Sequence, residues 1–145
     1  MFETENNNAG WIGIEWGMPI QEALLINARG LRRDEVFRKK YDDCEVTVGR
    51  LEQPDYTATV FFAFVREGLV SVMIDADDPR SALKIRDLLW MHFGSPSIDE
   101  VKIEDNDFQV RHVSWERTGR SCSIRAEFAG WGSTEEITKV WLNPQ

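Results

Sequence analysis

The sequence predicts an α+β domain built on a single antiparallel sheet of about five to seven strands, with two helices packed on one face. Three observations lead to this fold class. Short runs of β-branched and aromatic residues are joined by tight glycine-containing turns, which is typical of antiparallel hairpins. Two amphipathic segments carry helix start and stop signals. Two such helices need one apolar sheet face to cover, so both are expected on the same side.

The first half of the chain predicts a strand, a helix and three further strands. Residues 11–16 alternate in polarity and predict the first strand. Pro19 then opens a helix that ends near Gly30, because proline suits the first helical position and glycine the C-terminal cap. The next three strands are predicted at residues 45–51, 56–65 and 69–74. The last two form a hairpin that is apolar on both faces, which indicates a central place in the sheet.

The second half predicts a helix and another group of strands. Asp78 and Pro79 are an N-cap and a first helical residue, and Leu89 lies at the centre of the apolar stripe that follows. Gly94 ends this helix. The remaining strands are predicted at residues 108–115, 121–128 and 137–142, with a loop at 130–133. Alternation from Ser121 to Phe128 indicates a strand with one buried and one wet face.

The length and composition predict one domain. With 145 residues, of which 42% are hydrophobic, the chain is long enough to bury a core. We expect residues 10–145 to form this domain and residues 1–9 to be a flexible N-terminus. The start lacks the features of a secretory signal, and no stretch approaches the roughly 20 apolar residues of a membrane span. These features predict a cytoplasmic protein with no membrane partner.

Residues that usually carry catalysis are scarce and scattered. Cys44 and Cys122 have no local signature and are interpreted as reduced structural thiols. His112 is in phase with an apolar row of its strand, which favours a hydrogen-bonded core histidine over a catalytic one. We therefore predict no catalytic residues and a protein that is not an enzyme.

A metal site is not predicted either. A calcium loop beginning at Asp75 would need glycine where Arg80 stands and glutamate where Arg86 stands. The cysteines and histidines also lack the spacing of a zinc site. The sequence thus predicts no metal and no cofactor.

The acidic balance limits the class of partner. A net charge of −8 argues against direct nucleic-acid binding, which needs clustered lysine and arginine. The acids gather in three runs, at residues 42–45, 75–78 and 99–107. One interpretation is a solvated, solubilising face. The other is a surface that steers a basic partner, with candidate contact residues Asp75, Asp77, Asp78, Glu104, Asp105 and Asp107.

Trp131 is a further candidate contact residue. It stands between Gly130 and Gly132 in a predicted loop and is the least easily buried of the six tryptophans. An exposed tryptophan beside flexible glycines is typical of an interface anchor. The alternative is that its ring packs back over the edge of the sheet.

Several motifs give the chain a resemblance to small bacterial helix-on-sheet binding domains. These motifs are Trp16-Gly17-Met18, residues 68–72 after a turn, Phe93-Gly94-Ser95-Pro96 at a helix end, and Trp115 before a glycine turn. The resemblance covers roughly residues 11–128, and the proteins it includes are toxin-immunity proteins and β-lactamase-inhibitor-like modules. The resemblance implies a binding role by analogy of fold and carries over no functional residue.

These observations favour a cytoplasmic binding or inhibitor protein, monomeric or homodimeric. The most concrete form is an acidic immunity protein that neutralises a basic, nuclease-like toxin domain. Three alternatives remain: a subunit of a larger assembly, a phage inhibitor of a host defence nuclease, and a small-ligand-binding protein or enzyme with a pocket between helix and sheet.

Overall fold

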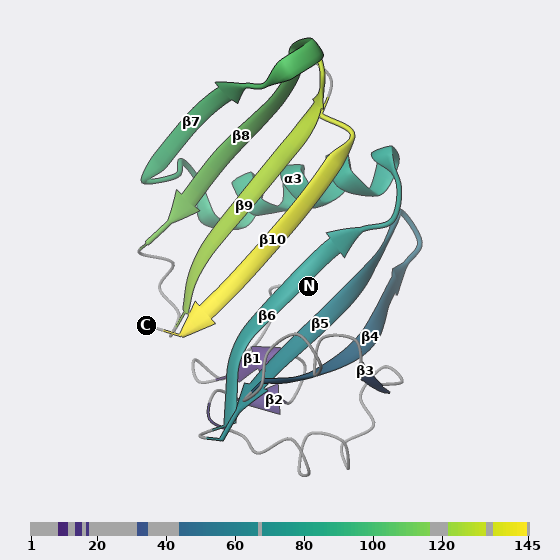
Figure 1. Ribbon diagram of the computed structural model, residues 1–145, viewed down its shortest axis with the longest axis vertical. Coiled ribbons are helices and arrows are strands. Elements are labelled where there is room, and N and C mark those ends of the chain that lie inside the picture. Colours follow the sequence, from purple (N-terminus) through teal and green to yellow (C-terminus); the bar gives the residue numbers. More distant parts are fainter. Residues whose placement is uncertain are drawn as a thin grey trace.

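The computed structural model describes residues 9–11, 14–15, 17, 32–34, 44–66, 68–116, 122–132 and 135–144. These residues form an eight-stranded antiparallel sheet, a separate pair of short strands and one α-helix (Figure 1). The α+β class and the antiparallel sheet are confirmed, although five to seven strands were predicted. The predicted helix that begins at Pro19 and the N-terminal residues 1–8 lie outside the described residues.

Two meanders make up the sheet. The first comprises β4 (Glu45–Gln53), β5 (Tyr56–Val65) and β6 (Gly68–Ala76). The second comprises β7 (Ile98–Ile103), β8 (Phe108–Trp115), β9 (Cys122–Trp131) and β10 (Ile137–Pro144). With β3 (Arg32–Asp34) at one edge, the strand order is β3-β4-β5-β6-β10-β9-β8-β7. The last strand therefore joins the two meanders by pairing with β6, as Figure 1 shows.

The helix α3 (Pro79–Phe93) connects β6 to β7 and crosses one face of the sheet (Figure 1). It begins at the predicted residue, and the Asp78 carboxylate caps it by accepting a hydrogen bond of 2.7 Å from the Ser81 N–H. It ends at Gly94, whose carbonyl accepts a 3.0 Å hydrogen bond from the Trp115 indole N–H on β8. Both ends of α3 are thus fixed, and Thr138 of β10 holds its first turn through the Ala82 carbonyl at 2.9 Å.

The core lies between α3 and the sheet. Ile85 and Leu89 are fully buried there, and Leu88 and Phe93 pack against the same cluster. The sheet contributes alternate residues of its inner strands, among them Phe62, Phe64, Val72, Ile74, Ile124, Ala126, Phe128 and Val140. The predicted alternation of the β9 segment is confirmed, since its even-numbered residues face the core. The opposite face, called here the open face, carries the odd-numbered residues of β5, β9 and β10 and, from Ser71 onward, of β6. Leu69 of β6 is buried in the core instead, because a register shift pairs it with Phe64.

Three features differ from the sequence predictions. The predicted first strand is instead two short strands, β1 (Ala9–Trp11) and β2 (Ile14–Glu15), paired with each other outside the main sheet. A tight hairpin has the same alternation as a single strand, so the polarity pattern did not distinguish them. Gly130 and Trp131 belong to the end of β9, not to a loop. Finally, β3 and β7 were not predicted, because β3 has three residues and β7 mixes charged and apolar residues on both faces.

No helix within the described ranges is long and apolar enough to cross a membrane.

Candidate functional site

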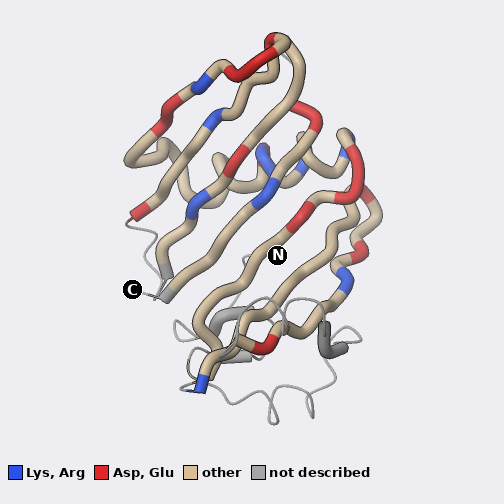
Figure 2. Tube along the Cα trace, viewed as in Figure 1, with Lys and Arg blue, Asp and Glu red and all other residues tan. Residues whose placement is uncertain are grey.

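The turn between β7 and β8 places an acidic cluster at one end of the sheet (Figure 2). Residues 105–107 form a tight turn in which the Phe108 N–H donates a hydrogen bond to the Asp105 carbonyl, and the Glu104 N–H donates one of 2.7 Å to the Phe108 carbonyl. Asn106 and Asp107 both have φ near +61°. Asparagine and aspartate tolerate this left-handed conformation better than other side chains, which explains their presence in the turn.

Trp131 lies directly beside this turn. It is opposite Phe108 in the β8–β9 register, and the two rings meet edge to face with centroids 5.0 Å apart. The next residue, Gly132, donates a backbone hydrogen bond of 2.9 Å to the Asp107 carbonyl. Trp131 nevertheless keeps 57% of its surface exposed. The ring is therefore held in place by its neighbour while most of it faces solvent.

We call this region the Trp131 surface and define it by Glu104, Asp105, Asp107, Phe108 and Trp131. It includes a shallow, open hollow whose walls also contain Lys102 and Ile137. The three acidic side chains are exposed and form no ion pair with another described residue. The structure therefore places Trp131 beside three predicted contact residues of the turn, Glu104, Asp105 and Asp107, from which it is distant in the sequence.

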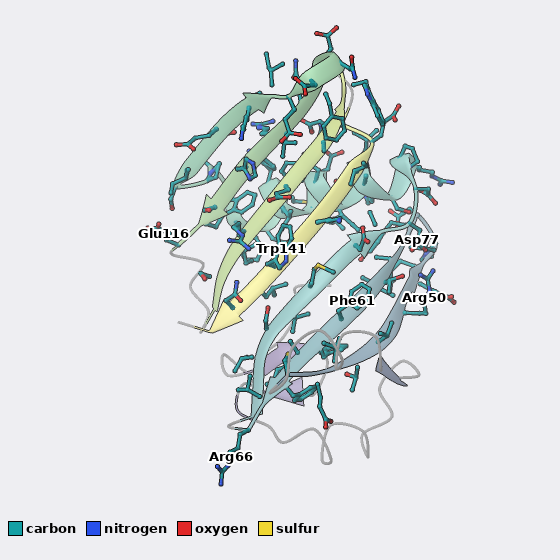
Figure 3. The ribbon with its side chains drawn as sticks, in the orientation of Figure 1. Arg50, Phe61, Arg66, Asp77, Glu116 and Trp141 are labelled. Atoms are coloured by element: carbon teal, nitrogen blue, oxygen red, sulfur yellow. The ribbon has the colours of Figure 1, made fainter. Side chains whose placement is uncertain are left out.

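The other predicted contact residues have structural contacts instead. Asp77 forms a bidentate ion pair with Arg50 of β4, one bond of which measures 2.9 Å (Figure 3). Hydrogen bonding to Arg50 lowers the pKa of the Asp77 carboxyl. Asp78 caps α3. Asp75 is half-buried opposite Lys139 of β10, and burial raises the pKa of its carboxyl. The β6–α3 connection thus uses its acids to hold the fold together.

A second ion-pair network neutralises the start of the acidic run at 99–107. Arg111 of β8 binds Asp99 of β7 through two hydrogen bonds of 2.7 and 2.6 Å, which lower the pKa of the Asp99 carboxyl. The same guanidinium lies 5.0 Å from the Trp90 ring centroid on α3. Glu135 then joins Arg111, at 3.6 Å, to Arg86 of α3, at 2.7 Å. This network connects β7, β8 and α3 on the helix side of the sheet. It neutralises Asp99 but includes none of the acidic side chains of the turn between β7 and β8.

The open face carries a row of polar and charged side chains across the sheet. Register pairs place Asp75 beside Lys139, Lys139 beside Glu127, and Glu127 beside His112. His112 Nδ1 lies 3.3 Å from a Glu127 oxygen, and the histidine side chain is 43% exposed. The prediction of a core histidine is therefore wrong. His112 is in phase with Val110 as expected, but that row faces away from α3.

An apolar hollow of about 260 Å³ also lies on the open face. Its walls include Phe61, Met73 and Trp141, with Cys44 at one side. Figure 3 shows Phe61 and Trp141 on neighbouring parts of this face. Burial raises the pKa of the Cys44 thiol, which makes it a poorer nucleophile. The hollow can accept a small apolar group, but it lies on the side of the sheet opposite to the predicted helix–sheet pocket.

The described ranges contain no group of three or more histidine, cysteine, aspartate or glutamate side chains that could hold a metal ion. Comparisons with models of protein families, with curated proteins and with solved structures give no match to this chain.

Sequence reasoning missed Phe108 as part of the site. It was assigned to a strand, and its role depends on standing opposite Trp131 in the β8–β9 register. A signal was present, because the predicted hairpin makes these two strands neighbours. The exact register depended on the connecting residues 117–120, which the pattern did not constrain.

Proposed function

We propose that this protein is a non-catalytic binding protein that docks a basic protein partner on the Trp131 surface. Its most concrete form is an immunity protein that neutralises a basic, nuclease-like toxin domain. The observation that supports this proposal best is Trp131 itself, which is 57% exposed yet braced against Phe108 beside an acidic turn. Tryptophan is enriched among residues that dominate binding energy, and a braced ring loses little conformational freedom on binding.

The charge around Trp131 indicates the sign of the partner. Glu104 and Asp105 line the hollow with only Lys102 to offset them, and the whole chain carries a net charge of −8. A field of one sign accelerates encounter with a partner of the opposite sign. In this mechanism the acidic turn raises the association rate of the partner, and Trp131 lengthens the residence time of the complex. Asp77 and Asp78, which are engaged within the fold, are not needed as contacts.

Reversing the acidic turn is expected to slow association. The variant carries Glu104→Lys and Asp105→Lys, together with Asp107→Asn because the φ of +61° at that position suits asparagine. The partner is first captured by pull-down from the native host and identified by mass spectrometry. Its association with each variant is then measured by stopped-flow binding. We expect association to slow several-fold near 0.15 M salt, and the difference to shrink toward 1 M salt as screening shortens to about 3 Å.

A control of similar change in net charge reverses two acids outside the Trp131 surface, Glu52 on β4 and Asp87 on α3, which are 72% and 68% exposed. This Glu52→Lys and Asp87→Lys variant should associate at nearly the rate of the unmodified chain. An equal slowing in both variants would show that net charge alone sets the association rate and that the turn does not steer the partner. An acidic partner would contradict the proposal outright.

Replacing the aromatic anchor is expected to act on dissociation. Trp131→Ala should weaken binding by about 2 kcal/mol, mostly through a faster off-rate, because it removes the large, mostly exposed ring of the surface. The control is Met91→Ala on α3, which also removes an exposed apolar side chain, 69% exposed, but on the other side of the sheet. Unchanged dissociation for Trp131→Ala would exclude this surface as the docking site. Turnover of a small molecule by the purified chain would contradict the binding-protein function itself.

A further inference from the structure

The strand β7 ends the sheet and has one edge without a partner strand among the described residues. It pairs only with β8, and all six of its residues are exposed. Its apolar members Ile98, Val101 and Ile103 are 43%, 59% and 66% exposed. An exposed edge with apolar side chains is a template for pairing with another strand. The outward backbone edge of β7 is distinct from the Trp131 surface, although Lys102 and Ile103 of β7 also line the hollow of that surface.

The alternation of hydrogen bonds indicates which backbone groups point outward. The Glu104 N–H bonds to the Phe108 carbonyl, so Glu104 directs its backbone groups toward β8. Successive residues of an antiparallel strand alternate in this direction. Asp99, Val101 and Ile103 therefore direct their N–H and C=O groups away from β8, where a further strand can bind them.

We propose that β7 pairs with β7 of a second copy of this chain, antiparallel, with the two-fold axis at Val101. An axis perpendicular to the sheet keeps each face continuous, so open-face residues must stand opposite open-face residues. In this register Val101 stands opposite Val101 of the second copy, and Asp99 stands opposite Ile103. On the open face, Glu100 stands opposite Lys102. The two sheets become one continuous antiparallel sheet.

Charge complementarity selects this register and the second copy as the occupant. Glu100 opposite Lys102 of the second copy occurs twice by symmetry, which gives two cross-strand pairs of opposite charge. Moving the axis by one residue in either direction places Glu100 opposite Glu100 or Lys102 opposite Lys102, and like charges directly opposite destabilise a strand pair. Edge charges normally discourage self-pairing. The alternating signs of Glu100 and Lys102 instead match at one symmetric register.

A charge swap in the full chain tests the pairing. Glu100→Lys places a lysine opposite Lys102 of the other copy at both symmetric positions. The like charges should lower the dimer association constant, measured by sedimentation equilibrium, by about tenfold or more. The double variant Glu100→Lys with Lys102→Glu restores both pairs and should recover dimerisation to within about threefold of the unmodified chain. A monomeric unmodified chain at high micromolar concentration, or a double variant as weak as the single one, would overturn the proposal.

A cysteine cross-link tests the register independently. Opposed Cα atoms in a hydrogen-bonded antiparallel pair are about 5.5 Å apart, within the range of a disulfide. Val101→Cys should therefore form a covalent dimer under mild oxidation. Ile98→Cys should not, because the two copies of residue 98 would lie roughly 20 Å apart along the strands. Equal cross-linking at both positions would indicate random collision and exclude this register. Glu100 and Val101 lie outside the Trp131 surface, so a monomeric unmodified chain or a Val101→Cys variant that does not cross-link would overturn the pairing and leave the proposed function intact.

Discussion

Leu89→Ala is expected to lower the free energy of unfolding by about 2–5 kcal/mol. Leu89 lies on the inner face of α3 with no exposed surface, next to the equally buried Ile85. Truncation removes the transfer energy of the side chain and leaves a cavity against the sheet, whose strands are too extensively paired to close over it. Urea denaturation followed by circular dichroism measures the loss as a lower midpoint with an unchanged slope.

The control for this prediction lies on the outer face of the same helix. Lys84 forms an ion pair with Asp55 at 3.1 Å, but both side chains are more than 40% exposed. Exposed pairs contribute little, so Lys84→Ala should change stability by about 0.5 kcal/mol or less. Similar losses for both variants would mean that α3 does not present Leu89 to the core.

Local signals in the sequence were enough to predict α3 and most strands. Asp78 and Pro79 defined the helix start because an N-cap and a prolyl first residue act through neighbouring backbone groups alone. β5 and β8 begin and end at the predicted residues, since alternation and turns are also local. The strand order was not predictable in this way. The place of β10 between β6 and β9 depends on pairing with a strand more than sixty residues earlier.

The edge strand β7 shows where periodicity fails. A strand is recognised when one face is buried and the other is wet. In β7, Ile98 shares a face with Glu100, and Val101 shares the opposite face with Asp99, so both faces are mixed. The segment was therefore interpreted only as part of an acidic run. Its exposure explains the pattern, because no residue of β7 is buried.

The candidate site was predicted in part. Exposure of Trp131 was one of two interpretations that its flanking glycines allowed, and the acidity of the turn followed from composition. Their proximity depends on the β8–β9 register, which is a non-local property. The structural role of Asp78 was local and was predicted. That of Asp77 was not, because Arg50 comes from a different strand pair.

Gly68→Ala is expected to destabilise the protein by about 2–5 kcal/mol. Gly68 begins β6 with φ of +110°, a conformation that costs a side-chain-bearing residue roughly 1–3 kcal/mol. A Cβ atom there would lie 2.1 Å from the carbonyl oxygen of Gly17 and 2.7 Å from its Cα. The Gly17 N–H donates a hydrogen bond of 3.1 Å to the Leu69 carbonyl, which holds the two segments together. Because the contact is with backbone, no side-chain rotation relieves it.

Gly132→Ala separates the two causes of that loss. Gly132 also has a positive φ, +65°, but an added Cβ would meet no atom within 4 Å. Both variants carry a cost for positive φ and the small gain from a stiffer unfolded chain. The φ of Gly132 lies in the left-handed helical region and that of Gly68 lies outside it, so the difference in unfolding free energy contains this conformational difference together with the contact with Gly17. We expect Gly68→Ala to lose at least about 1–2 kcal/mol more than Gly132→Ala, because a backbone clash adds an overpacking cost of roughly 1–3 kcal/mol. Equal losses in urea denaturation would show that Gly17 does not pack against Gly68 in solution. A larger loss for Gly68→Ala is the result expected if Gly17 packs against the start of β6, at the end of the sheet opposite to the Trp131 surface.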